Sequence, residues 1–138
     1  MQKLFSEEIH GWKSWGRVFQ SIDAFYPLIR EIFRREGLPM SGVAHLTPGT
    51  NAVFRVGDYV VKIFAPAESG MNMDSDYVTE LFGMERANKL GVPSPKLRCA
   101  GTLADRYLFR YLVMDHLEGD ALCDRHASLT RREKIHVG

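Results

Sequence analysis

The chain has 138 residues, which is enough for one domain with a single hydrophobic core. Hydrophobic residues make up 45% and charged residues 25%, and the formal net charge is +1, so no strong field attracts nucleic acid or a membrane surface. The N-terminal 16 residues contain two glutamates and no apolar run, unlike a signal peptide. No stretch of the chain approaches the roughly 20 apolar residues that span a bilayer. We therefore expect a cytoplasmic protein that binds neither nucleic acid nor membranes.

Cysteine and histidine residues give no metal-binding pattern in the sequence. The two cysteines, Cys99 and Cys123, are far apart, and the five histidines are dispersed without the spacing of a zinc site. A disulfide between them remains an alternative, but a reduced pair is the usual state in the cytosol. We predict no metal site in this chain.

Residues 1–40 are expected to form a helical extension. Apolar residues near its start recur at mostly helical spacing and predict a short amphipathic helix or an aromatic cover: Trp12, Trp15, Val18 and Phe19. The range 21–36 is the clearest helix, because five apolar side chains fall on one face: Phe25, Leu28, Ile29, Ile32 and Phe33. Gly37 is expected to end this helix.

The apolar pattern after residue 40 changes to the alternation that is typical of strands. Three strands are predicted in succession, joined by turns at 48–51 and 57–58, and they form an antiparallel meander: 43–47, 52–56 and 59–64. The small and polar residues of 65–74 predict a mobile loop.

One helix and two strands are predicted next. The helix covers 75–90 and buries a side made by Tyr77, Leu81, Met84, Ala87 and Leu90. Gly91 ends it, and the prolines that follow force an extended exit. The strands cover 96–102 and 107–115, and a linker at 116–121 precedes a helix with capping-box spacing that begins at Thr130.

These elements predict an α+β fold with a five-stranded antiparallel sheet. The helix at 75–90 is expected to pack on one face, and the helix at 21–36 to be added outside the sheet. We divide the chain into a helical extension (1–40), a lobe (41–115), and a linker with the start of a further helical part (116–138).

The order of these elements resembles the N-terminal lobe of aminoglycoside phosphotransferases and choline-kinase-like small-molecule kinases, which share the protein-kinase-like fold. Residues 46–64 (LTPGTNAVFRVGDYVVKIF) are similar to the first three strands of that lobe. Residues 80–95 (ELFGMERANKLGVPSP) are similar to its helix C, and residues 111–122 (YLVMDHLEGDAL) to its fifth strand and hinge. The resemblance covers roughly residues 43–126, and it rests on order and spacing together.

The resemblance implies a site for nucleotide phosphates. Lys62, within an apolar third strand, would bind the α- and β-phosphates, and Glu80 of helix C would hold its ammonium group in place. Glu85 fits the family spacing less well. The loop that contains Gly49, Thr50 and Asn51 stands where the phosphate-covering loop belongs, although it lacks the full glycine-rich motif and also reads as an ordinary hairpin turn.

The resemblance also implies an adenine site at the hinge. Met114 would line the back of the pocket, and Val60 and Pro95 would add apolar contact. The backbone carbonyl of Asp115 and the backbone N–H of Leu117 would bond the adenine edge. His116 is expected to be an exposed linker residue.

The function implied is that of the nucleotide-binding lobe of an ATP-dependent phosphotransferase. The intact enzyme would use ATP (or GTP) with Mg²⁺ to phosphorylate a hydroxyl of a small molecule. The catalytic loop and metal-binding aspartate of the family are expected downstream of this chain, because Asp120 and Asp124 come too early, in the linker. We therefore expect no catalytic residue here, and a truncated lobe that is inactive alone.

Two alternatives stay open. The chain could be a non-catalytic binding or dimerisation module, with the exposed apolar face of the lobe covered by a second copy in a homodimer. It could also be a free-standing α+β domain in which Lys62 and Glu80 form a structural ion pair.

Overall fold

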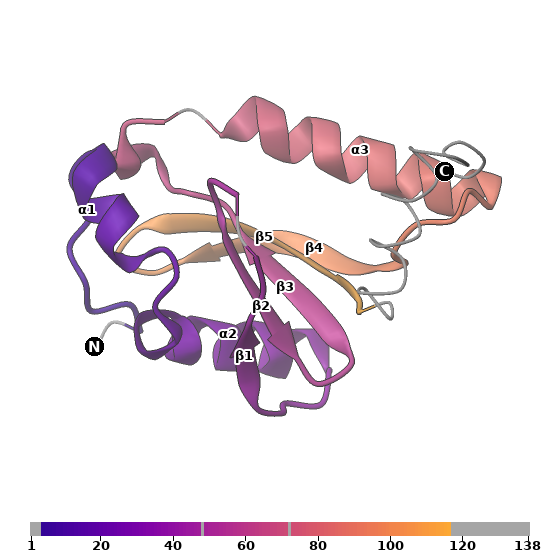
Figure 1. The fold of residues 1–138 in the computed structure, drawn as a ribbon, viewed down its shortest axis with the longest axis horizontal. Helices are drawn as coiled ribbons and strands as arrows, with labels where there is room; N and C mark the ends of the chain where they lie inside the picture. The colour runs from indigo at the N-terminus through magenta and orange to yellow at the C-terminus, as the bar shows by residue number, and fades with distance from the viewer. Residues whose placement is uncertain (1–3, 48, 72, 117–138) are drawn as a thin grey trace.

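Five antiparallel strands form one sheet in a computed structural model that describes residues 4–47, 49–71 and 73–116 (Figure 1). The strands are β1 (Val43–His45), β2 (Ala52–Val56), β3 (Tyr59–Ile63), β4 (Leu97–Ala104) and β5 (Leu108–Asp115). The described helices are α1 (Trp12–Val18), α2 (Ile22–Glu36), α3 (Asp74–Leu90) and a short 3₁₀ turn, η1 (Ala67–Ser69). The predicted α+β class and five-stranded sheet are confirmed, while the predicted linker and helix after residue 116 lie outside the described residues.

The strand order is β1-β2-β3-β5-β4, so β5 lies between β3 and β4. The β2–β3 hairpin turns at Gly57, whose φ of 62° is in the left-handed region that glycine adopts freely. Lys62 of β3 is opposite Val53 on one side and Leu112 on the other. β4 has an irregularity between Leu97 and Cys99, which leaves Arg98 outside the regular register.

Two layers of helix enclose the sheet. In Figure 1, α3 lies along one face, α2 crosses the opposite face, and α1 lies at one end of the sheet next to η1. Side chains alternate between these faces along each strand, because successive Cβ atoms point to opposite sides. In β3, for example, Val61 and Ile63 are buried on the α2 side. Lys62 is on the α3 side.

Helix α2 forms where the sequence predicts it. The Ser21 hydroxyl accepts a hydrogen bond from the Ala24 N–H (3.1 Å), which caps the first turn, and Gly37 ends the helix with a φ of 71°. The five side chains predicted on its apolar face are all buried. The extension and the sheet therefore share one hydrophobic core.

Aromatic side chains fill the core on the α2 side. Phe25 packs against the rings of Phe5, Trp15, Phe54 and Phe109, with centroids 5.0 to 6.3 Å apart. Phe5 lies before α1 and Trp15 within it, while Phe54 and Phe109 come from strands β2 and β5. The predicted aromatic cover near the N-terminus is thus present, although Trp15 is buried and Trp12 is exposed.

The segment predicted as a mobile loop, 65–74, differs from that prediction. It contains η1, and Ala65 and Ser69 are buried. The Ser69 hydroxyl donates to the Pro66 carbonyl (2.7 Å), and the Gly11 N–H donates to the Glu68 carbonyl (2.7 Å). The sequence showed small polar residues, but it did not show that α1 packs over them.

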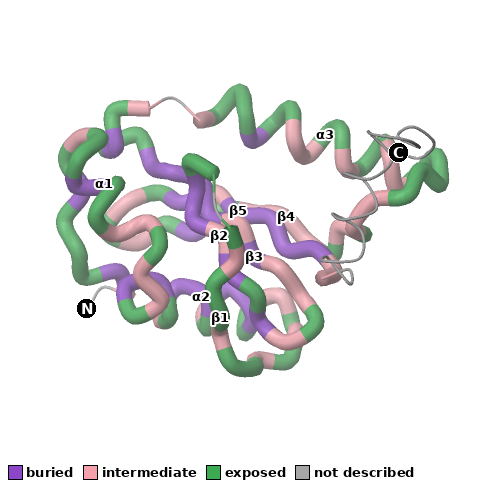
Figure 2. Tube along the Cα trace, viewed as in Figure 1, coloured by how far each residue is buried: buried purple, intermediate pink, exposed green. Residues whose placement is uncertain are grey.

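Helix α3 is packed more sparsely than α2, as the mostly exposed tube in Figure 2 shows. Tyr77 alone among its 17 residues is buried, and Leu81, Met84 and Ala87 are half-buried. Leu90, which we placed on the buried side, is exposed at the end of the helix.

Candidate functional site

An ion pair joins the middle of the sheet to α3. The Lys62 Nζ and the Glu80 Oε1 are 2.6 Å apart, with side chains 23% and 32% exposed, respectively. Lys62 Nζ also lies 5.1 Å from the centroid of the Phe64 ring, where a cation is attracted to the aromatic face. The structure thus pairs Lys62 with Glu80 of α3, the partner that we selected, and Glu85, the alternative, is exposed.

Helical periodicity explains why Glu80 is the residue that reaches Lys62. Tyr77 anchors the helix to the sheet through an edge-to-face contact with Phe64 (centroids 5.2 Å apart). Glu80 follows three residues later, on a neighbouring part of the same face. The β3 pleat places Lys62 on that face too, two residues before Phe64.

A cavity of about 400 Å³ lies beside the ion pair. Its lining combines the β1–β2 loop, the centre of β3 and the first half of α3: Thr50, Asn51, Lys62, Met73, Asp76, Thr79 and Glu80. Two carboxylates and one ammonium group therefore face it. An anion that enters must be bound at Lys62 and separated from Asp76.

The loop between β1 and β2 is anchored from two sides. The Asn51 side chain is buried, and its Oδ1 accepts a hydrogen bond from the Ala65 N–H (2.8 Å). The Thr50 carbonyl accepts a hydrogen bond from the Trp15 Nε1–H (2.9 Å). Gly49 is exposed, with open space where a Cβ would be. The loop thus holds Thr50 and Asn51 at the cavity, while the Asn51 side-chain oxygen is committed to joining the loop to Ala65, after β3.

The predicted adenine-binding residues lie toward the other end of β3 and β5. Val60 and Met114 are opposite each other in the β3–β5 register. Both belong to a small apolar cluster on the α3 side, whose fully or nearly buried members are Phe64, Tyr77, Leu112 and Met114. Lys62 and this cluster therefore share one face of the sheet.

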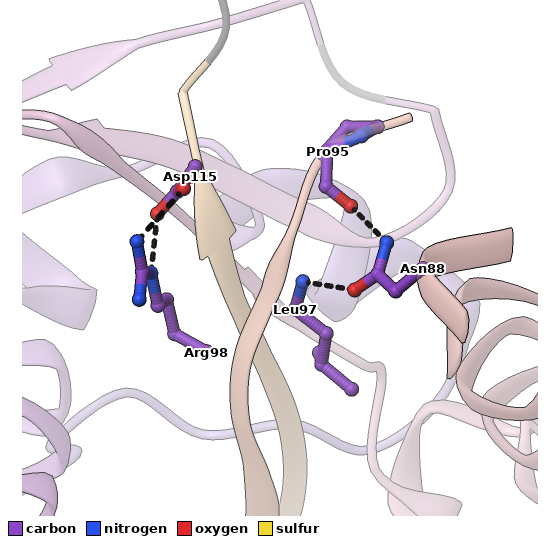
Figure 3. Close-up of polar contacts among 5 residues, drawn as sticks. All are labelled: Asn88, Pro95, Leu97, Arg98 and Asp115. Atoms are coloured by element: carbon purple, nitrogen blue, oxygen red, sulfur yellow. Dashed lines mark hydrogen bonds and ion pairs between the residues drawn. The ribbon is translucent and has the colours of Figure 1, made fainter. Parts of the chain in front are cut away.

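The end of β5 is tied to two neighbouring segments. Arg98 donates two hydrogen bonds to the Asp115 carboxylate (2.6 and 3.1 Å), as Figure 3 shows, and this pairing raises the pKa of Arg98. The Asp115 N–H donates to the Lys96 carbonyl, and the His116 N–H donates to the Asp58 carbonyl. His116 is half-buried rather than exposed. Leu117 lies outside the described residues.

The sequence analysis missed Asn88, in the last turn of α3. The Asn88 amide bonds the segment that follows the helix and so fixes the exit to β4 (Figure 3). The sequence feature that could have indicated this role is an asparagine three residues before Gly91, followed by a proline-rich segment. Asparagine side chains near such helix ends commonly bond the backbone nearby.

A second cavity, of about 520 Å³, lies beyond Met73, which lines both cavities. Phe64, Met71 and Leu108 supply apolar surface, and an Arg110–Asp74 ion pair (3.1 Å) lies at its wall. Neither the cavity nor this ion pair was foreseen, because the pair joins residues 36 positions apart through the packing of α3 on β5.

Two titratable groups on the α2 side have raised pKa values. Burial, together with the nearby Glu36 carboxylate, raises the pKa of Tyr111 and that of Cys99 each to about 12. The Tyr111 hydroxyl donates a hydrogen bond to Glu36. Both groups belong to the core on the α2 side, on the face of the sheet away from Lys62.

Comparison of the chain with protein-family models, curated proteins and solved structures gave no match. Among the residues that the structure describes, no group of three or more histidine, cysteine, aspartate or glutamate side chains is arranged to hold a metal ion. No helix in the described ranges has the length and apolar character that crossing a bilayer requires.

Proposed function

We propose that the chain is the nucleotide-binding lobe of an ATP-dependent small-molecule phosphotransferase, similar to the N-terminal lobe of aminoglycoside phosphotransferases. One observation carries the proposal: Lys62 on the central strand pairs with Glu80 of the only helix on that face of the described sheet, beside a cavity that the β1–β2 loop also lines. A lysine held in this way presents a fixed positive charge to a phosphate group.

The residues present fit a nucleotide with Mg²⁺. Lys62 would bind phosphate oxygens, and Val60 and Met114 would contact the base from the apolar end of the same face. Because Asp76 and Glu80 place two carboxylates at the cavity, the nucleotide would be bound as its magnesium complex, in which the metal offsets phosphate charge. We assign binding, and not phosphoryl transfer, to the described residues.

The experiment is a calorimetric titration of the chain with Mg·ATP and Mg·GTP, repeated on Lys62→Ala. We expect binding to the unaltered chain and at least about tenfold weaker binding to Lys62→Ala, because the variant loses a charge-assisted bond to phosphate. Lys13→Ala, which removes an exposed lysine of α1, is the matched control and should bind like the unaltered chain. Absence of binding, or equal affinity in Lys62→Ala, would reject the proposal.

A second candidate is a dimerisation module, favoured by the outer side of α3. Val78 and Phe82, one turn apart on this helix, are each 61% exposed. The first turn of α3 holds Asp74 and Asp76, and its last turn holds Lys89, so two copies packed antiparallel would bring opposite charges together. Sedimentation of the chain and of Phe82→Ser tests this candidate, which requires a dimer that the substitution dissociates.

A further inference from the structure

Helix α3 depends on few contacts for its position over the sheet. Its one buried residue, Tyr77, contacts the Phe64 ring and donates a hydrogen bond to the Gly101 carbonyl (3.4 Å), and the half-buried Leu81 and Met84 pack against the same apolar cluster. The Arg110–Asp74 and Lys62–Glu80 ion pairs add two further contacts. All of these come from the first three turns of the helix, so the last turn needs a separate attachment to keep that end from tilting.

Asn88 supplies that attachment. Its Oδ1 accepts a hydrogen bond from the Leu97 N–H (2.7 Å), and its Nδ2 donates to the Pro95 carbonyl (3.0 Å) and to the Ser94 hydroxyl (3.2 Å). Figure 3 shows the amide turned from the last helical turn toward the start of β4. An amide that uses both its donor and its acceptor on backbone groups fixes direction as well as distance.

The position of the remaining anchor makes this attachment matter for the site. Without the Asn88 bonds the helix would pivot about Tyr77, and Glu80 is three residues, or about 4.5 Å, from that point, so a tilt of about 15° would move Glu80 by about 1 Å. The Lys62–Glu80 distance is 2.6 Å, and an increase of about 1 Å takes it beyond the length of a hydrogen bond.

The segment that receives Asn88 also receives the end of β5. Lys96 and Arg98 flank Leu97, and they bond the backbone and the carboxylate of Asp115, respectively. Figure 3 shows the Asn88 bonds to Pro95 and Leu97 and the Arg98 bonds to Asp115 on this short stretch of chain. The helix that carries Glu80 and the strand that carries Met114 are thus held to one common support.

We propose that Asn88 is a positioning residue that locks α3 to the start of β4, and thereby holds Glu80 at Lys62 and sets the affinity of this site for nucleotide phosphates. Asn88 itself touches no part of the ligand in this account. The effect on affinity rests on the proposed function, whereas the effect on the ion pair does not.

The first test measures the ion pair without any nucleotide. In Asn88→Ala, the NMR signal of the Lys62 ammonium group should shift toward that of Glu80→Gln, and amide hydrogen exchange should increase across Tyr77–Ala87 while α2 stays protected. Lys89→Ala, an exposed neighbour on the same turn, is the matched control and should change neither. Unchanged Lys62 and α3 signals in Asn88→Ala would overturn the positioning role.

The second test is a double-mutant cycle on Mg·ATP affinity. We expect Asn88→Ala to weaken binding about three- to tenfold in the unaltered background, and less than about twofold once Glu80→Gln is present, because the two residues act as one unit. An equal loss in both backgrounds would show that Asn88 does not act through Glu80. If the unaltered chain does not bind Mg·ATP, the proposed function fails and the inference about affinity fails with it, while the ion-pair measurement still decides the positioning role.

A more conservative variant covers the case in which Asn88→Ala does not fold. Asn88→Asp keeps an oxygen for the Leu97 N–H and replaces the donor to Pro95 with an acceptor. Asn88→Asp should also weaken the Lys62–Glu80 ion pair, so the NMR signal of the Lys62 ammonium group should shift in the same direction as in Asn88→Ala. A Lys62 signal identical to that of the unaltered chain would count against the proposal.

Discussion

The two faces of the sheet are built differently. The α2 face has a continuous core of aromatic and aliphatic side chains that includes Phe25, Trp15, Phe54 and Phe109. Among the described residues, the α3 face has a cluster of four buried residues, two ion pairs to α3 and two cavities. The contrast teaches that one helix is held by buried apolar area, which is strong and non-directional, and the other by a few directional contacts that leave room beside them.

We therefore expect the stability of the fold and the binding of a ligand to depend on different faces of the sheet. Substitutions on the α2 face should lower the free energy of unfolding, whereas those at Lys62 and Glu80 should change binding with little effect on stability. Binding sites are commonly drawn from the less stable parts of a fold, because an element that must accept a ligand cannot be fully packed.

The largest expected effect is that of Phe25→Ala. The ring is fully buried among four other aromatic rings, so its removal should cost about 3 to 5 kcal/mol in the free energy of unfolding. Urea denaturation measures the loss. Tyr26→Ala, at the exposed neighbouring position, is the control and should cost less than about 1 kcal/mol. Similar losses in the two variants would contradict the buried aromatic core described on the α2 face.

Gly101→Ala should have the next largest effect. A Cβ at residue 101 would lie 2.8 Å from the Tyr111 hydroxyl, which bonds Glu36 of α2, so we expect a loss of about 1 to 3 kcal/mol. Tyr111→Phe removes the crowded oxygen. The same substitution at 101 should therefore cost less in a Tyr111→Phe background, and an equal cost in both backgrounds would contradict the packing described here.

The free energy of unfolding should also decrease at high pH, because of a titratable group on the α2 face. The pKa of Tyr111 rises from its ordinary value of 10.0 to about 12 in the fold, so folding favours the protonated phenol. That contribution is complete below pH 10 and is lost as the pH rises toward 12. Denaturation at pH 9 and pH 11 should show the decrease, and Tyr111→Phe should show a smaller one. An identical decrease in the variant would assign it to other groups, such as Cys99.

The smallest effect on stability is expected at the α3 face. Glu80→Gln breaks a partly exposed ion pair, so the free energy of unfolding should change by less than about 1 kcal/mol. Mg·ATP should nevertheless bind more weakly, because Lys62 is no longer held in place. A loss of several kcal/mol, with unchanged nucleotide binding, would favour the structural role of this pair.

The sequence predicted the elements well, because their signals are local. Helix α2 and the β2–β3 hairpin carry clear apolar periods and glycine stops, and they lie where the patterns placed them. The Lys62–Glu80 contact was reached through the resemblance to a kinase lobe, since no local pattern links a strand residue to a helix residue 18 positions later.

What the sequence did not predict depends on packing between distant segments. Residues 65–74 look like a free loop until α1 covers them. Asn88 looks like a solvated residue near a helix end until the exit folds back to the start of β4. Arg110 and Asp74 are 36 positions apart and meet through the placement of α3. Such contacts are properties of the tertiary structure, which a one-dimensional pattern does not record.

The measurement that tests the account most directly is NMR mapping of the backbone amides during a titration with Mg·ATP. We predict that shifts cluster on the α3 face, at Thr50, Asn51, Val60, Lys62 and Met114, and that α2 amides do not move. Saturable shifts with this distribution would place the nucleotide beside the Lys62–Glu80 pair. Shifts confined to the α2 face, or no shifts at saturating Mg·ATP, would contradict the proposed site.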